Sequence, residues 1–189
     1  ILIASDSPAF VTNYYKLLEY HLERLSDKYN TVILDPSQRI NNQFFDGIQR
    51  FDTSLEVDNV MKTILEDFKK RVASPSQDYP KWLILIPDIA ATAMAAGMNE
   101  ADFKELLTEG SRYGVTLIFA GAYQDLVTNQ YDNFVKLVNQ LVEQVFLGVR
   151  ISDQDHTRYP YITNEPALKP NQGYILYPDH YESVQLLEI

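Results

Sequence analysis

The chain has 189 residues, 46% of them hydrophobic, a net charge of −10 and no cysteine. This composition fits one compact α/β domain and excludes a disordered chain, disulfides, thiolate metal sites and cysteine nucleophiles. The acidic balance argues against nucleic acid or anionic lipid as a partner unless the few cations cluster. No apolar run is long enough to span a bilayer, and no secretory signal is visible.

Short apolar runs alternate with helical periodicities along the first 150 residues. Apolar, β-branched runs predict buried strands at 1–4, 31–34, 82–86, 115–120 and 145–149. Apolar residues at helical spacing predict helices over 10–25, 55–72, 99–110 and 134–142. Thr53 with Glu56 forms a capping-box pattern, Asn99 is a candidate N-cap, and Gly110 is expected to end its helix. Fully apolar strands separated by helices predict a mainly parallel sheet of about five strands, with helices on both faces.

The last forty residues have a different pattern. The stretch 151–173 is polar and contains Pro160, Pro166 and Pro170, so we expect an irregular segment there. Two apolar runs flank Pro178-Asp179 and predict a β-hairpin over 174–189. The whole chain, 1–189, is expected to form a single domain.

Ligands of parallel α/β sheets bind beyond the carboxyl ends of the strands, so the residues that follow each strand are the site candidates. The first strand is followed by Ser5 to Thr12, the second by Asp35, the third by Pro87-Asp88 and the fourth by Gly121 to Gln124.

The order of these segments resembles the FtsK/SpoIIIE-type P-loop ATPase family over nearly the whole chain. The Walker A loop, GxxxxGK[ST], falls on Ser5, Asp6, Ser7, Pro8, Ala9, Phe10, Val11 and Thr12. The strand that ends in Asp35-Pro36 resembles the family's second strand, and Leu83 to Asp88 falls on the Walker B strand. Within the family, the pattern is most similar to the degenerate last ATPase domain of type VII secretion ATPases of Gram-positive bacteria.

This resemblance implies a RecA-like P-loop NTPase fold. It also implies a C-terminal position in a larger protein that is anchored in the cell membrane, with this domain in the cytoplasm. The partners it implies are the secreted protein substrates of the type VII system and neighbouring ATPase domains of the same chain. It further suggests a homo-oligomer formed through the parent protein, and no nucleic acid is expected.

The Walker A positions depart from the family pattern. Other residues hold the two glycine positions and the lysine position, namely Ser5, Phe10 and Val11. Pro8 removes a backbone N–H donor, and Asp6 adds a negative charge where polyphosphate would lie. Loss of the lysine contact alone removes a charge-assisted bond of roughly 1.5–3 kcal/mol, a 10- to 150-fold loss of affinity. Only Thr12 still matches, at the position whose hydroxyl meets Mg²⁺.

The Walker B positions are also incomplete. Pro87 occupies the place of the metal-binding aspartate, and Asp88 that of the water-positioning acid. A shift by one residue gives Asp88 the metal role but leaves Ile89 in the second place, so one role is empty on either alignment.

Each candidate residue has a structural alternative, which we favour in most cases. Ser5–Thr12 is either a phosphate site or a plain βα turn, and Asp35 and Asp88 are either metal ligands or caps. Arg112 and Arg150 are either arginine fingers or surface ion pairs, and Gln124 is either a sensor residue or a loop residue. The three histidines have no ligand spacing, so no metal site is expected, and partial burial is expected for the helical one (His21, His156 and His180). Tyrosines near polar loops are candidate partner contacts (Tyr123, Tyr159 and Tyr161).

The expected function is therefore a non-catalytic module of the secretion ATPase that recognises substrates or regulates the catalytic domains, without a cofactor. One alternative is a weak ATP-binding or ATP-hydrolysing motor domain, with ATP and Mg²⁺ held through Thr12 and Asp88. A second alternative is a DNA-translocase module, against which the net charge of −10 argues.

Overall fold

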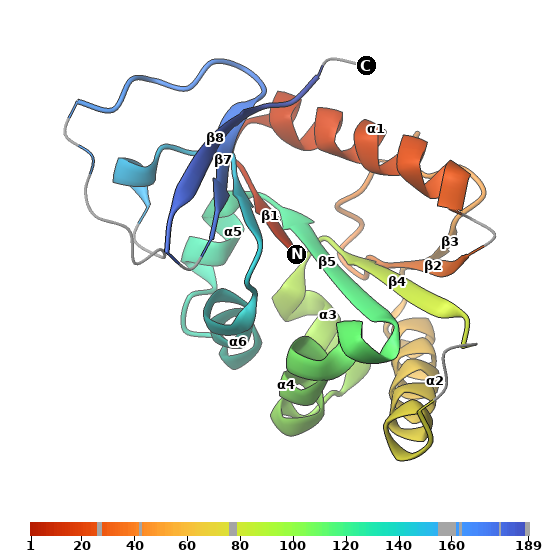
Figure 1. Ribbon diagram of the computed structural model, residues 1–189. Coiled ribbons are helices and arrows are strands. Elements are labelled where there is room, and N and C mark those ends of the chain that lie inside the picture. The colour runs from red at the N-terminus through yellow and green to blue at the C-terminus, as the bar shows by residue number, and fades with distance from the viewer. Residues whose placement is uncertain are drawn as a thin grey trace.

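The computed structural model describes residues 1–25, 28–41, 43–75, 79–154, 162, 164–177 and 179–187. Within them the chain forms one eight-stranded mixed sheet with the strand order β3-β2-β4-β5-β1-β6-β7-β8 (Figure 1). The strands are β1 (Leu2–Ala4), β2 (Tyr29–Leu34), β3 (Gln49–Phe51), β4 (Lys81–Ile86), β5 (Val115–Gly121), β6 (Val145–Leu147), β7 (Gln172–Leu176) and β8 (Tyr181–Gln185). All pairings among strands β1 to β6 are parallel, whereas β7 pairs antiparallel with both β6 and β8.

Helices lie on both faces of this sheet. The helices are α1 (Pro8–Leu25), α2 (Ser54–Ala73), α3 (Ile89–Ala96), α4 (Glu100–Glu109), α5 (Tyr123–Thr128) and α6 (Asn133–Leu141), with 3-10 turns η1 (Gly110–Tyr113) and η2 (Ile151–Asp153). Helix α1 lies along one face, and α2, α3, α4 and α6 lie on the other (Figure 1). No helix in the described ranges has the length and apolarity required to cross a bilayer.

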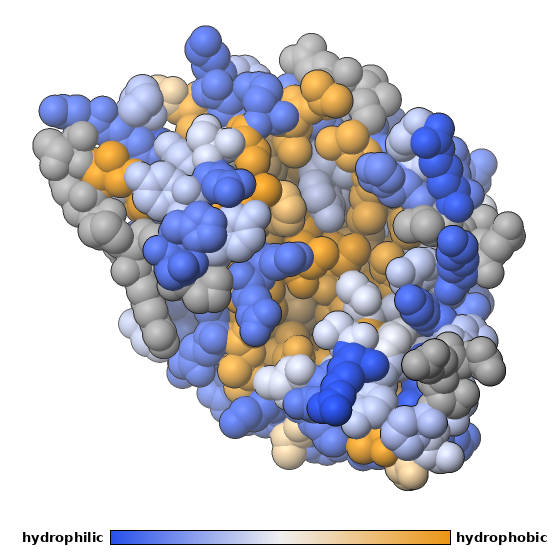
Figure 2. Space-filling model, in the orientation of Figure 1, coloured by the Kyte–Doolittle hydropathy of each residue, from blue (hydrophilic) through white to orange (hydrophobic). Residues whose placement is uncertain are grey.

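The central strands are buried on both sides, which explains their unbroken apolar sequences. In β4, Ile84 and Ile86 pack in the core beneath α2, whereas Leu83 and Leu85 pack in the core beneath α1. Figure 2 shows apolar side chains at the bottom of a hollow on the viewed face of the molecule. The prediction of a mainly parallel sheet with helices on both faces and a terminal hairpin is confirmed.

The helix caps follow the sequence signals. The Thr53 hydroxyl accepts from Glu56 N, the Glu56 carboxylate accepts from Thr53 N, and the Asn99 side chain accepts from Asp102 N. Helix α4 does end before Gly110, but the chain continues there as a 3-10 turn. The left-handed residue that ends this turn is Gly114, with φ 77°.

The structure contains three elements that the sequence analysis did not predict, and each omission has a physical reason. Strand β3 has only three residues, two of them polar, and pairs only with β2 at the sheet edge. Helix α3 is apolar and alanine-rich, so its sequence has no amphipathic period. Helix α5 has six residues, too few to show a period.

The C-terminal segment extends the main sheet. Strand β7 begins at Gln172, inside the predicted irregular stretch, and pairs antiparallel with β6, so the hairpin continues the sheet beyond β1 and β6. Pro178 at the predicted turn lies outside the described residues.

A buried carboxylate ties the irregular segment to the sheet. Glu165 is 8% exposed and accepts hydrogen bonds from Ile151 N (3.0 Å), Ser152 N (2.8 Å), the Ser152 hydroxyl (2.8 Å) and the Tyr174 hydroxyl (2.5 Å). Burial by itself raises the pKa of Glu165, but the hydrogen bonds from Tyr174, Ser152 and Ile151 outweigh it and lower this pKa. The ionised form of Glu165 therefore stabilises the folded chain.

We predict that Glu165→Gln destabilises the chain at neutral pH by roughly 1–3 kcal/mol, because an amide nitrogen replaces one acceptor oxygen among these donors. Because the pKa of Glu165 is lower in the folded chain than in the unfolded chain, Glu165 contributes fully to stability at a pH above its unfolded-state pKa. This contribution is lost as the pH falls through its folded-state pKa. Urea unfolding at a series of pH values measures this. The difference in free energy of unfolding between wild type and Glu165→Gln should become smaller in acid. Glu66→Gln, at an exposed glutamate, is the control and should not change the stability. Equal stability of wild type and Glu165→Gln at pH 7 would contradict the assignment.

Candidate functional site

The connection from β1 to α1 is short. Only Ser5, Asp6 and Ser7 separate the end of β1 at Ala4 from the start of α1 at Pro8. The Ser5 hydroxyl is buried and donates to Gly148 O at 2.9 Å, and it accepts from Ser7 N at 3.0 Å. The hydroxyl of Ser5 thus fastens the end of β1 to the residue that follows β6.

Helix α1 begins in the middle of the predicted loop. The Ser7 hydroxyl accepts from Phe10 N at 3.4 Å, and Pro8 occupies the first helical position, where its missing N–H costs nothing. Ala9 is exposed in the first turn, and Val11 and Thr12 are half-buried further along the helix. The Thr12 hydroxyl therefore lies beyond the first turn of α1, away from the helix terminus that a P-loop presents to phosphate.

Phe10 fills the space beside the carboxyl end of β1. Its side chain is fully buried, in the core on the α1 face of the sheet. Two glycines allow this approach: a Cβ on Gly148 would lie 3.0 Å from Phe10 Cδ1, and a Cβ on Gly173 would lie 2.9 Å from Phe10 Cε2. The position that holds a loop glycine in the resembled family is thus occupied here by a core aromatic ring.

Asp6 is exposed and caps a neighbouring element. Its Oδ1 accepts from Gln124 N at 2.9 Å, which joins the end of β1 to the first turn of α5. Gln124 lies in α5 rather than in a loop, and its backbone makes this contact.

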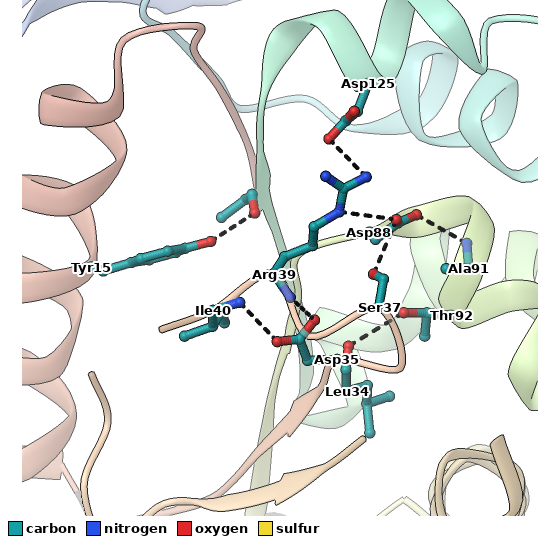
Figure 3. Close-up of polar contacts among 11 residues, drawn as sticks. Tyr15, Leu34, Asp35, Ser37, Arg39, Ile40, Asp88, Ala91, Thr92 and Asp125 are labelled. Carbon is teal, nitrogen blue, oxygen red and sulfur yellow. Dashed lines mark hydrogen bonds and ion pairs between the residues drawn. The ribbon is translucent and has the colours of Figure 1, made fainter. Parts of the chain in front are cut away.

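Asp35 and Asp88 use their carboxylates in the same way. Asp35 is fully buried, with Oδ1 accepting from Arg39 N at 2.8 Å and Oδ2 from Ile40 N at 2.9 Å. Asp88 is the N-cap of α3, where its Oδ1 accepts from Ala91 N at 3.0 Å (Figure 3). Both residues therefore hold local turns at the ends of β2 and β4, the alternative favoured from the sequence.

Arg39 lies between two of the carboxylates, and the sequence analysis did not identify it. Its Nε is 3.6 Å from Asp88 Oδ2, and its Nη2 is 3.6 Å from Asp125 Oδ2 (Figure 3). The Ser37 hydroxyl also donates to Asp88 Oδ2, at 3.1 Å. No local pattern marks this arginine, because its partners come from the ends of β4 and β5.

Two further contacts hold the elements around this edge. The Tyr15 hydroxyl donates to Ala120 O at 3.0 Å, and the Thr92 hydroxyl donates to Leu34 O at 3.3 Å (Figure 3). Burial, reinforced by the nearby Asp35 charge, raises the pKa of Tyr15, so this phenol stays protonated and acts as a donor.

A small cavity lies among residues of β1, β4, β5, α3 and α5, and its lining contains none of residues 5–12. The cavity there has a volume of about 20 Å³, and its lining includes Asp88 and Asp125. That volume accommodates about one water molecule. Among the described residues, no group of three or more His, Cys, Asp or Glu side chains is arranged to hold a metal ion.

The other candidate residues include two arginines, Arg112 before β5 and Arg150 after β6, and each forms an ion pair with a residue close to it in the sequence. Arg112 pairs with Glu109 at 3.8 Å, and Arg150 pairs with Asp153 at 2.6 Å. His21 is exposed and packs edge-on against Tyr20, which corrects the expectation of partial burial; its position on the solvent side of α1 explains this.

Of the three tyrosines predicted as partner contacts, the structure describes Tyr123. Tyr123 is 7% exposed and belongs to the core beneath the helices opposite α1. Tyr159, Tyr161 and His156 lie outside the described residues.

Comparison with known proteins gives a consistent picture. The chain is 23% identical over 184 residues to the type VII secretion system protein EssC of Staphylococcus aureus strain NCTC 8325, a match that covers 97% of this chain. The chain spans about 12% of the length of that relative. No family model matches this chain.

Two solved structures share the fold. EssC (ATPases 2 and 3) from Geobacillus thermodenitrificans superposes with a TM-score of 0.70 at 18% identity, over 98% of this chain and 36% of that one. Thermomonospora curvata EccC (ATPases 2 and 3), solved in complex with a signal sequence peptide, superposes with a TM-score of 0.66 at 13% identity. The match covers 98% of this chain and 36% of the EccC chain. The chain is thus homologous to EssC and has the ATPase fold, as the family resemblance predicted.

The packing around Phe10 generates a prediction about Gly148. A Cβ on Gly148 would lie 2.5 Å from Ser5 Cβ, so Gly148→Ala should destabilise the chain by about 1–3 kcal/mol. Removing the opposing side chain should relieve the clash, so the penalty for Gly148→Ala should be smaller in a Ser5→Gly background. Urea unfolding of the four proteins of this double-mutant cycle measures the coupling. Strictly additive effects would show that Ser5 does not pack on Gly148.

Proposed function

We propose that this EssC homologue is a non-catalytic ATPase-fold module of a type VII secretion ATPase, which engages secreted substrates or regulates neighbouring ATPase domains. The observation that carries this proposal is the short connection between β1 and α1, with Phe10 buried where a phosphate loop would need open backbone. The homology explains the shared ATPase fold. The difference between this connection and a Walker A loop supports a role without nucleotide turnover.

Three requirements for triphosphate binding are unmet at this edge. A phosphate cradle needs a run of free backbone N–H groups, but Ser7 N and Phe10 N bond to serine hydroxyls and Val11 N bonds to Ser7 O. It needs a lysine, and the matching position holds Val11. It needs a glycine at the sixth position of the motif so that the backbone can close on a phosphate, and that position holds the buried Phe10.

The charges at this edge point the same way. Asp6 and Asp88 would face the phosphates, and repulsion between like charges would weaken binding. The cation among them, Arg39, already contacts Asp88 and Asp125. We therefore propose that the module works without ATP or Mg²⁺.

The proposed setting follows from the homology. We place the module in the cytoplasm, as part of a longer chain that is anchored in the cell membrane of a Gram-positive bacterium. Its proposed partners are the secreted substrates of the type VII system and neighbouring ATPase domains of the same chain. The signal sequence peptide bound to EccC ATPases 2 and 3 supports a secreted protein as the substrate class.

We predict that the chain shows no saturable heat of binding when titrated with Mg-ATP at millimolar concentration in a calorimeter. Thr12→Ala should behave like wild type, because Thr12 lies past the first turn of α1 and away from the N-terminus of this helix. Micromolar affinity that falls on Thr12→Ala would overturn the non-catalytic assignment and favour the motor-domain alternative. Salt-sensitive binding to duplex DNA would instead favour the translocase alternative.

We also predict that the chain binds a peptide with the signal sequence of a secreted substrate of its own type VII system, or a neighbouring ATPase domain of its parent protein. Fluorescence anisotropy with the labelled peptide measures the first and co-purification the second, with a scrambled peptide as control. Tyr159→Ala with Tyr161→Ala should weaken binding, whereas Tyr131→Ala, at an 80% exposed tyrosine, should not. If neither partner binds, the proposed recognition or regulatory role fails.

A further inference from the structure

Arg39 connects three strand ends that are distant in sequence. It lies on the segment after β2, and its guanidinium contacts Asp88 after β4 and Asp125 after β5, each at 3.6 Å (Figure 3). The backbone on either side of it is held at its base, because the buried Asp35 carboxylate accepts from Arg39 N and Ile40 N. The arginine therefore extends from a rigid turn toward the two acids.

Acidic side chains near one another favour a cation between them. Asp6, Asp88 and Asp125 surround the edge, and Asp6 bonds to Gln124, the residue next to Asp125. Each of Asp6 and Asp88 uses one oxygen to cap a helix, so helices α3 and α5 both depend on acids that repel one another. A positive charge between Asp88 and Asp125 offsets that repulsion.

The contacts that Arg39 makes are weak enough to open. Its side chain is 50% exposed, and both ion pairs are longer than a hydrogen bond. Pairs of this kind contribute little individually and are screened by salt. Asp35, by contrast, is fully buried, so the base of the turn stays in place when the guanidinium moves.

We propose that Arg39 is a salt-sensitive latch that holds the Ser37–Ile40 segment against the ends of β4 and β5. When its charge is removed or screened, the segment separates from Asp88 and Asp125, and α3 and α5 open at their first turns. The latch goes beyond the proposed function, because it describes how this edge moves and not what the module binds.

Hydrogen exchange of the intact chain, with and without added salt, tests the latch. In Arg39→Gln, amides in 37–38, 89–92 and 123–127 should exchange about 3- to 10-fold faster than in wild type at low salt. The amides of residues 39 and 40, which bond to the buried Asp35 carboxylate, should not change. High salt should bring wild type toward the variant. Asp125→Asn removes one of the two ion pairs together with one of the acids, so it should accelerate exchange less than Arg39→Gln does.

The matched control is Lys62→Gln, which removes an exposed ion pair with Asp58 on α2 and should leave the three segments unchanged. Unchanged exchange in Arg39→Gln would overturn the latch, as would a uniform acceleration along the whole chain. The readout uses no nucleotide or peptide, so it is independent of the tests of the proposed function. Nucleotide binding by wild type would refute that function and leave the exchange result interpretable.

Discussion

The packing of Phe10 against two glycines determines how the carboxyl end of β1 is built. Because Gly148 and Gly173 have no Cβ, the ring lies directly against the backbone after β6 and within β7. Helix α1 must then start early, at Pro8, for its first turn to place Phe10 there. The same contact ties the antiparallel hairpin to the parallel sheet, since Gly173 belongs to β7 and β7 pairs with β6. A change of Phe10 to glycine would thus remove a core residue from the first turn of α1.

Acidic residues stabilise the surrounding edge by accepting from backbone donors. Asp6, Asp35 and Asp88 all bind N–H groups at the start of a turn or helix. A carboxylate at a helix N-terminus is favoured by the exposed donors and the helix dipole, so these positions need no metal to explain them. The cost is mutual repulsion at one end of the sheet, which Arg39 offsets from a segment that carries no motif.

The sequence was sufficient for the parts of the fold that local patterns determine. The apolar strands 82–86 and 115–120 were placed almost to the residue, since a strand buried on both faces has an unbroken apolar run. The pair Ser7-Pro8 also carried a usable signal, a capping serine before a proline at the first helical position, which would have placed the start of α1 inside the segment interpreted as either a phosphate site or a βα turn. Strand β3 and helix α3 were missed because a short polar edge strand and an alanine-rich helix show no period.

The site itself depends on contacts between distant segments. Ser5 bonds to Gly148 across 143 positions, and nothing near Gly148 in the sequence marks it as the neighbour of the β1–α1 connection. The strand order, by contrast, depends mainly on apolar strand residues that pack in two cores, and Phe10 is the fully buried residue of this segment that joins one of them. Ser5, Pro8 and Val11 lie outside the strands, whereas Phe10 adds a fully buried ring to the core on the α1 face. This separation explains why the chain keeps the architecture of an ATPase along nearly its whole length, while its first strand ends in a packed core.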